Sequence, residues 1–394
     1  MTLDGVVNGG VEDRLLTSNF VFATLVNFFN SFSVQMLSAT LPVYVLSLGG
    51  SQAEAGLVSG SVAVTAVIFR PLMGWLTDAW RRRPLVLVGS SFYCFASVFY
   101  LLAGSIPLLV LGRLVQGFGL SCYSTASNVY VADLAPIKRR AEAVGLFSAA
   151  QAFAIVIGPV IGFMLVGWSG FRHLFYLTGG LAITALLFSL LTQERRQASK
   201  MGRPPWSLRT GIVAVDALPV AWMAFCMGIG LGSISAFIAI FSQSRGVENP
   251  GFYFMVQAIA LLLSRTFTGR LADRAGRTFV IVPGVILMAA ALSILPLLQG
   301  FHYFVISASL FGIGFGSAQP ATMALLIDRV APAQRGLATG TYFTGFDLGF
   351  IIGTMLMGVV CKHWGFGVMW SIAAAFTLLS LAGIFADRCH SRSS

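Results

Sequence analysis

Charged residues are scarce in this chain. They make up 10% of its 394 residues, whereas hydrophobic residues make up 57%. A soluble globular protein ordinarily has about 25% charged residues. A water-soluble fold of this composition would leave apolar surface in contact with water, which burial in lipid avoids. The composition therefore excludes an ordinary soluble protein and indicates one that is embedded in a membrane.

Several site patterns are also missing. The five cysteines form no Cys-x-x-Cys pair and the four histidines lack metal-ligand spacing, so we expect neither a disulfide framework nor a metal site. No ATP-binding motif and no nucleophile–base–acid set occurs, so we expect no cofactor and no enzyme activity. The net charge of +11 comes from clusters between apolar runs and not from a basic stripe with aromatics, which excludes nucleic acid as a partner.

Long apolar runs are abundant instead. A membrane-spanning helix needs about 20 residues. The sequence has twelve such runs, at approximately 19–47, 54–77, 84–104, 107–132, 142–167, 171–191, 216–241, 251–272, 278–298, 302–327, 337–361 and 365–386. The longest polar stretch separates the first six from the last six. We therefore predict an N-terminal six-helix bundle (1–191), a cytoplasmic linker (192–215) and a C-terminal six-helix bundle (216–394).

The basic residues indicate the orientation. With the N-terminus in the cytoplasm, 19 of the 25 Lys and Arg residues fall in cytoplasmic segments and 3 in outside segments. Cytoplasmic loops carry such an excess of basic residues. We therefore predict that both termini are cytoplasmic, and a bacterial inner (plasma) membrane fits the short loops.

The two halves align at an offset of 195 residues. The aligned pairs are Arg70 and Arg265, Gly74 and Gly269, Asp78 and Asp273, Gly117 and Gly312, Gly119 and Gly314, Asp133 and Asp328, Gly145 and Gly340, and Gly158 and Gly353. Six helices is an even number, so the two repeats have the same orientation. Parallel repeats of this kind are the layout of one large class of transporters.

The residues that follow the second helix of each half resemble the major facilitator superfamily. The family pattern Gly-x-Leu-Ala-Asp-Arg-x-Gly-Arg is similar to the segment from Gly74 to Arg83 and, more closely, to the segment from Gly269 to Arg277. The first copy has Arg81 where the turn glycine is expected. The resemblance covers nearly the whole chain and implies an all-α membrane protein with twelve transmembrane helices in two pseudo-symmetric bundles. It also implies a monomer that transports a small molecule.

Two further motifs resemble the drug:proton antiporter, or efflux, branch. One runs from Arg113 through Gln116 and Gly117 to Gly119, and the other contains Gly158, Pro159 and Gly162. The second motif is incomplete, because Ala154 and Phe163 replace two of its glycines. Small residues allow close helix packing and proline bends a helix, so we expect the second motif to act through packing.

The resemblance implies that the loop motif is a latch that closes the cytoplasmic side. Its residues would be Gly74, Asp78 and Arg82 with their equivalents Gly269, Asp273 and Arg277. Carboxylates at a helix end can face a neighbouring helix N-terminus or an arginine through contacts that form and break easily. The alternative is ordinary charge at a helix end that only sets the topology.

Asp347 is the acidic residue that we place deepest in a predicted span. It lies about ten residues, or roughly 15 Å, into its helix. Burial penalises the ionised carboxylate, so Asp347 is our proton-coupling candidate. The alternative is a structural partner for a buried arginine or a backbone amide. We expect Arg70 and Arg265, which are equivalent in the repeat, to be structural and to turn towards the inner surface, with substrate binding as the alternative for each.

Polar residues inside the spans indicate where a substrate binds. The resemblance extends the central cavity of the family to Asn27, Asn30, Gln35 and Gln319, and Arg113 is a further candidate because it keeps its charge. Each of them could instead bridge helices by hydrogen bonds.

The leading functional hypothesis is proton-coupled export of a small amphipathic molecule by alternating access. Uptake or facilitated diffusion of a sugar, metabolite or organic ion is the alternative, because the fold hosts both. A membrane enzyme or sensor is a third possibility, which the residues disfavour.

Overall fold

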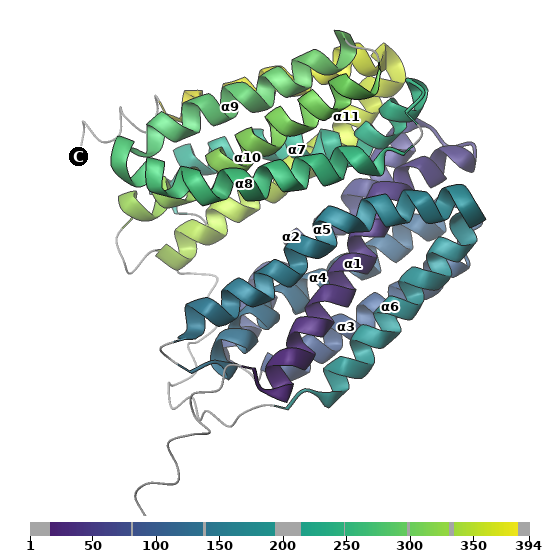
Figure 1. Ribbon diagram of the computed structural model, residues 1–394, viewed down its shortest axis with the longest axis vertical. Helices are drawn as coiled ribbons and strands as arrows, with labels where there is room; N and C mark the ends of the chain where they lie inside the picture. The colour runs from purple at the N-terminus through teal and green to yellow at the C-terminus, as the bar shows by residue number, and fades with distance from the viewer. Residues whose placement is uncertain are drawn as a thin grey trace, which may run out of the picture.

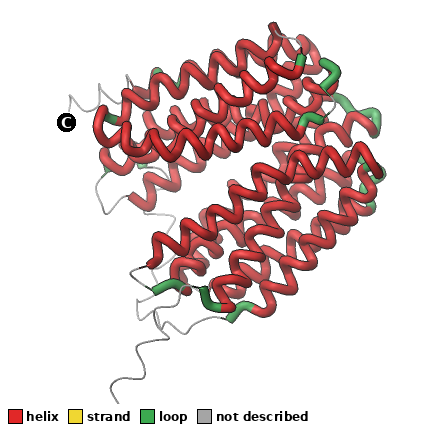
Figure 2. Tube along the Cα trace, in the orientation of Figure 1, coloured by secondary structure: helices red, strands yellow, loops and turns green. Residues whose placement is uncertain are grey.

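The computed structural model describes residues 16–79, 82–136, 139–193, 214–247, 249–297, 300–330 and 335–384, and in these ranges it is helical throughout, with turns and short loops (Figures 1 and 2). The helices are α1 (Ser18–Ser47), α2 (Gln52–Ala79), α3 (Arg82–Leu101), α4 (Ile106–Leu134), α5 (Arg140–Ser169), α6 (Phe171–Leu191), α7 (Leu218–Ser244), α8 (Gly251–Ala275), α9 (Arg277–Ile294), α10 (Phe301–Arg329) and α11 (Arg335–Leu379). Most of the predicted linker (192–215) lies outside the described residues.

The element α11 contains two membrane spans. Its 45 residues would reach about 68 Å as one straight helix, twice the ~30 Å of a bilayer core. Gly365, with φ 79° and ψ 174°, interrupts the helix. Only glycine adopts this backbone conformation readily. The ten other long helices and the two parts of α11 therefore match the twelve predicted spans.

The helices form two bundles, α1 to α6 and α7 to α11, which lie one below the other in Figure 1. In the first bundle α4 packs on α2 and α3, and α1 packs on α5 and α6. In the second, α10 packs on α8 and α9, and α11 packs on α7. The prediction of an all-α membrane protein with two pseudo-symmetric bundles is confirmed.

Glycine contacts follow the repeat within each bundle. A Cβ atom at Gly117 would lie 2.2 Å from the carbonyl oxygen of Val62, and one at Gly312 would lie 2.3 Å from that of Gln257. Val62 and Gln257 are themselves 195 residues apart. Both glycines therefore allow the same close helix crossing, between α2 and α4 in one half and between α8 and α10 in the other.

The two bundles meet through α2 with α11 and α5 with α8. We call the end at which α6 ends and α7 begins the linker end, and the opposite end the far end. At the far end, Gly251 of α8 lies against Pro159 and Val160 of α5, with a Cβ position 2.7 Å from the Pro159 oxygen. Towards the linker end the ribbons of the two bundles diverge (Figure 1).

Candidate functional site

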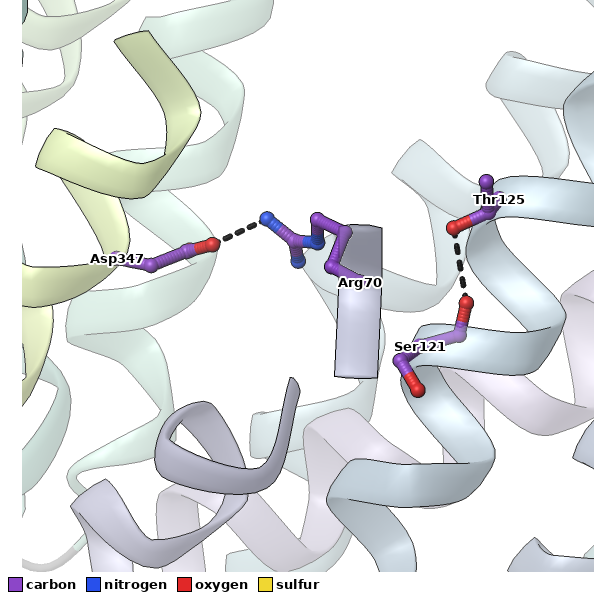
Figure 3. Close-up of polar contacts among 4 residues, drawn as sticks. All are labelled: Arg70, Ser121, Thr125 and Asp347. Carbon is purple, nitrogen blue, oxygen red and sulfur yellow. Dashed lines mark hydrogen bonds and ion pairs between the residues drawn. The ribbon is translucent and has the colours of Figure 1, made fainter. Parts of the chain in front are cut away.

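An ion pair joins the two bundles. The guanidinium of Arg70 on α2 donates from Nη1 to Oδ2 of Asp347 on α11. Figure 3 shows the two side chains extended towards each other, while on the other side of Arg70 the Thr125 hydroxyl donates to the Ser121 carbonyl oxygen within α4. Asp347 was predicted to lie deep in a span, and its side chain is 15% exposed. Arg70 does not turn towards a membrane surface as expected, because it reaches across to the other bundle.

The strength of this pair depends on the ionisation of both groups. Removing two charges from water is unfavourable, and their mutual attraction offsets that loss only while both are ionised. A proton on Asp347 would remove the charge–charge attraction and leave a neutral carboxyl group that still accepts a hydrogen bond from Arg70. The pair fits both the proton-coupling interpretation of Asp347 and the alternative of a structural partner for an arginine.

A cavity of about 440 Å³ lies between the bundles. Helices α1 and α5 of the first bundle and α7, α8, α10 and α11 of the second contribute its lining. The polar uncharged residues that line it are Gln35, Ser38, Ser148, Gln151, Ser235 and Gln257. Aromatic rings of Phe254, Phe315 and Phe350 and several aliphatic side chains cover the rest. An apolar cavity with a few convergent polar groups suits a small amphipathic molecule.

Arg265 of α8 also lines this cavity. Its Nη2 donates to the amide oxygen of Gln319 on α10 at 3.2 Å. The expectation that Arg265 turns towards the inner surface is wrong, because it faces the interior space between the bundles. Gln319, a predicted cavity residue, contacts the cavity lining through Arg265.

The other predicted cavity residues lie in the first bundle. Gln35 lines the 440 Å³ cavity and also an adjoining pocket of about 130 Å³ between α1, α3, α4 and α5. Asn27 and Asn30 line only this smaller pocket. Both also bridge helices: Asn27 Nδ2 donates to the Phe147 oxygen at 3.0 Å, and Asn30 Nδ2 to Ser90 Oγ at 3.3 Å. The cavity and bridging interpretations therefore both describe these two residues.

Arg113 is buried inside the first bundle, with 1% of its surface exposed. Its Nη1 donates to Gln116 Oε1 at 2.8 Å, and both Nη atoms lie 3.4 Å from Ser38 Oγ. Ser38 lines the 440 Å³ cavity. Arg113 therefore lies one side chain behind the cavity wall, and its geometry is that of a helix bridge between α4 and α1.

Two equivalent ion pairs involve the predicted latch arginines. Arg82 Nε lies 3.2 Å from Asp133 Oδ2, and Arg277 Nε lies 3.0 Å from Asp328 Oδ2. Each pair joins neighbouring helices of one bundle, α3 with α4 and α9 with α10. The aspartate partners were not predicted, although their equivalence in the repeat was a usable signal. For Gly74, Asp78, Gly269 and Asp273 only the helical backbone is described. The side chains of the two aspartates lie outside the described part of the structure.

The second antiporter-like motif packs α5 against α1. A Cβ atom at Gly158 would lie 2.9 Å from Gln35 Cβ, and one at Gly162 would lie 3.2 Å from Thr40 Cγ2. Pro159 lines the 440 Å³ cavity and contacts Gly251 of the other bundle. The motif thus lies where the cavity ends towards the far end.

The family model of the Major Facilitator Superfamily matches residues 23–262 and 220–388. The chain is 23% identical to multidrug resistance protein 2 of Bacillus subtilis, over 85% of this chain and 87% of that protein. It is 26% identical to the multi-drug resistance efflux pump PmrA of Streptococcus pneumoniae, with coverages of 92% and 94%.

Solved structures share the fold. A nucleoside transporter, NupG, superimposes with a TM-score of 0.75 at 17% identity, covering 93% of this chain and 98% of that one. A peptide transporter of the POT family bound to alafosfalin superimposes with a TM-score of 0.79 at 13% identity, with coverages of 96% and 97%. At these identities the likeness extends to the fold alone.

Proposed function

The chain belongs to the Major Facilitator Superfamily, and on that basis we propose that it exports a small amphipathic molecule in exchange for protons by alternating access. It is a multi-pass membrane transporter, and several of its relatives are named as multidrug efflux proteins. The sequence contains no ATP-binding motif. Uphill transport by this chain would therefore draw on an ion gradient.

The ion pair between Arg70 and Asp347 is the observation that supports the proposal of proton coupling. It joins the two halves that alternating access moves against each other. When Asp347 binds a proton, α2 and α11 lose their electrostatic contact, and the two halves can slide at a lower free-energy cost. When the proton leaves, the contact re-forms and favours the arrangement described here.

The packing supports a state closed at the far end. Gly251 is in contact with Pro159 there, and the cavity between the bundles lies on the linker side of this contact. In the proposed orientation the linker end and both termini are cytoplasmic, because the predicted cytoplasmic segments hold 19 of the 25 basic residues. We further propose a monomer in the plasma membrane of a bacterium.

The alternative is an uptake symporter or a facilitator of a sugar, metabolite or organic ion. One feature favours it: Ala154 and Phe163 stand where the antiporter motif has glycines. The direction of proton movement during transport separates the two functions.

Proton flux into liposomes that contain the purified protein tests the proposal. Candidate drugs, sugars and metallophore-like acids are added one at a time to wild type and to Asp347→Asn. We expect substrate-evoked proton movement opposite to substrate in wild type, and its loss by about tenfold or more in Asp347→Asn. Glu142→Gln is the matched control, since Glu142 on α5 pairs in an exposed contact with Arg139, the residue that precedes the helix.

Two results would contradict the proposal. Substrate movement without protons, equal in wild type and in Asp347→Asn, would indicate a facilitator. Proton movement in the same direction as substrate would indicate uptake by symport.

A further inference from the structure

The repeat places two arginines in equivalent positions with different surroundings. Arg70 on α2 and Arg265 on α8 are 195 residues apart, as are Ala152 on α5 and Asp347 on α11. The interfaces are equivalent too, because α2 packs on α11 and α8 packs on α5. Arg70 binds Asp347, whereas the residue in the matching place for Arg265 is Ala152. Arg265 and Ala152 both line the 440 Å³ cavity.

The charge of Arg265 is not neutralised by the cavity lining. Of the described residues that line the cavity, Arg265 alone is charged. Its hydrogen bond goes to the neutral amide of Gln319 at 3.2 Å. The carboxylate of Asp347 is engaged by Arg70 and is not part of the lining.

A second guanidinium adds positive potential from behind the wall. Arg113 is 1% exposed, and the hydrogen bonds given above connect it to Gln116 and Ser38, both neutral. Ser38 separates it from the cavity by a single side chain. Charges that are little screened by water act strongly in such surroundings, and a cavity lined by one sign of charge concentrates ligands of the opposite sign.

We propose that the transported molecule carries an anionic group, such as a carboxylate, phosphate or sulfonate, that binds Arg265. This group would occupy the place that Asp347 takes beside Arg70, in the space left open by Ala152. The apolar part of the molecule lies against Phe254, Phe315 and Phe350. The inference rests on the proposed function, since it describes the cargo of the same cavity.

Binding to the purified full-length protein in detergent, with no gradient, tests the charge preference. Three fluorescent probes share one apolar body: pyrenebutyrate is an anion, pyrenebutanol is neutral and pyrenebutylamine is a cation. Wild type should bind the anion about 5- to 10-fold more tightly than the other two, because Arg265 is exposed and solvent weakens the charge pair that it forms with the anion. Arg265→Gln should remove most of the preference and leave only what Arg113 contributes from behind the wall, and Arg265→Lys should keep more of it.

Ala152→Asp tests directly whether a carboxylate at position 152 would bind Arg265. The new carboxylate should bind Arg265 and weaken pyrenebutyrate binding about tenfold or more, whereas Ala152→Asn, a matched control of the same size, should weaken it less. Without any ligand, Ala152→Asp should unfold at a higher temperature than Ala152→Asn. Arg265→Gln should abolish that difference, as expected for a direct contact.

Equal binding of the three probes, tighter binding of the cation, or failure of the anion to bind would overturn the inference. So would a preference for the anion that is undiminished in Arg265→Gln. The outcome is separable from that of the proposed function. Binding of the anion without proton movement in liposomes would refute proton exchange alone, and proton exchange with a cationic substrate would refute the anionic cargo alone.

Discussion

Gly56 of α2 lies directly against Thr354 of α11, so that a Cβ atom at Gly56 would be 2.2 Å from the Thr354 carbonyl oxygen. The contact is the repeat equivalent of the one between Gly251 and Pro159, because both residues are shifted by 195. The two halves therefore close the far end through a pair of equivalent glycine contacts.

Gly56→Ala should open the far end. The added methyl group cannot fit against backbone, and overpacking of this kind costs about 1–3 kcal/mol. Spin labels on cysteines at Leu102 and Phe301, which are exposed on opposite halves at this end, should show a longer distance. Gly145→Ala is the control, since nothing lies within 4 Å of a Cβ there. An unchanged distance distribution in Gly56→Ala would mean that the far end tolerates the methyl group.

Arg70 and Asp347 should be energetically coupled. Arg70→Gln leaves a carboxylate that is 15% exposed without its partner, and Asp347→Asn leaves the arginine, which is 34% exposed. Because the pair is partly exposed, we expect each single change to lower the free energy of unfolding by about 1–3 kcal/mol, less than for a fully buried pair. The double variant should be more stable than the sum of the two losses predicts. Thermal unfolding in detergent measures this, and strictly additive losses would argue against a direct contact.

The ion pairs inside each bundle should matter little for stability. Asp133→Asn and Asp328→Asn each remove one pair whose groups are partly exposed. Exposed pairs of this kind contribute about 0–1 kcal/mol. Unfolding of either variant should therefore resemble that of wild type. A loss above about 2 kcal/mol would show that these aspartates do more than pair with Arg82 and Arg277.

Gly365→Ala should destabilise the connection between the last two spans. Gly365 has φ 79° and ψ 174°, a conformation that is strained by about 1–3 kcal/mol in a residue with a side chain. Gly170, which joins α5 to α6 with φ 81° and ψ 173°, should respond in the same way. Gly367→Ala is the control, because it is helical and its nearest Cβ contact is at 4.0 Å. Equal unfolding temperatures for Gly365→Ala and Gly367→Ala would contradict the expectation.

Much of the fold follows from the sequence because the bilayer leaves few alternatives. Backbone groups in lipid must be hydrogen-bonded internally, so each long apolar run becomes a helix. The repeat also predicted which glycines are equivalent, including Gly117 and Gly312. It could not predict their contacts, Val62 and Gln257, because those depend on how neighbouring helices cross.

The site was predictable only in part. The depth of Asp347 follows from its position in a run, but its partner is 277 residues away in the other half. Arg70 and Arg265 were both misjudged, because their shared position in the repeat does not reveal which residues face them. The packing is indeed equivalent, and what differs is the facing residue, Asp347 in one case and Ala152 in the other.

The difference between Ala152 and Asp347 has a consequence for how such a protein can diversify. Equivalent helices pack together at the two interfaces, and the charge of a single residue differs between them. In the proposed mechanism, the interface of α2 with α11 contains Asp347 and responds to protons. The interface of α5 with α8 has Ala152 in the equivalent position and binds the substrate. An acidic residue at position 152 would then pair with Arg265 inside the protein, whereas alanine leaves Arg265 to bind an anionic substrate. A single substitution at this position could therefore change the class of substrate while the fold stays the same.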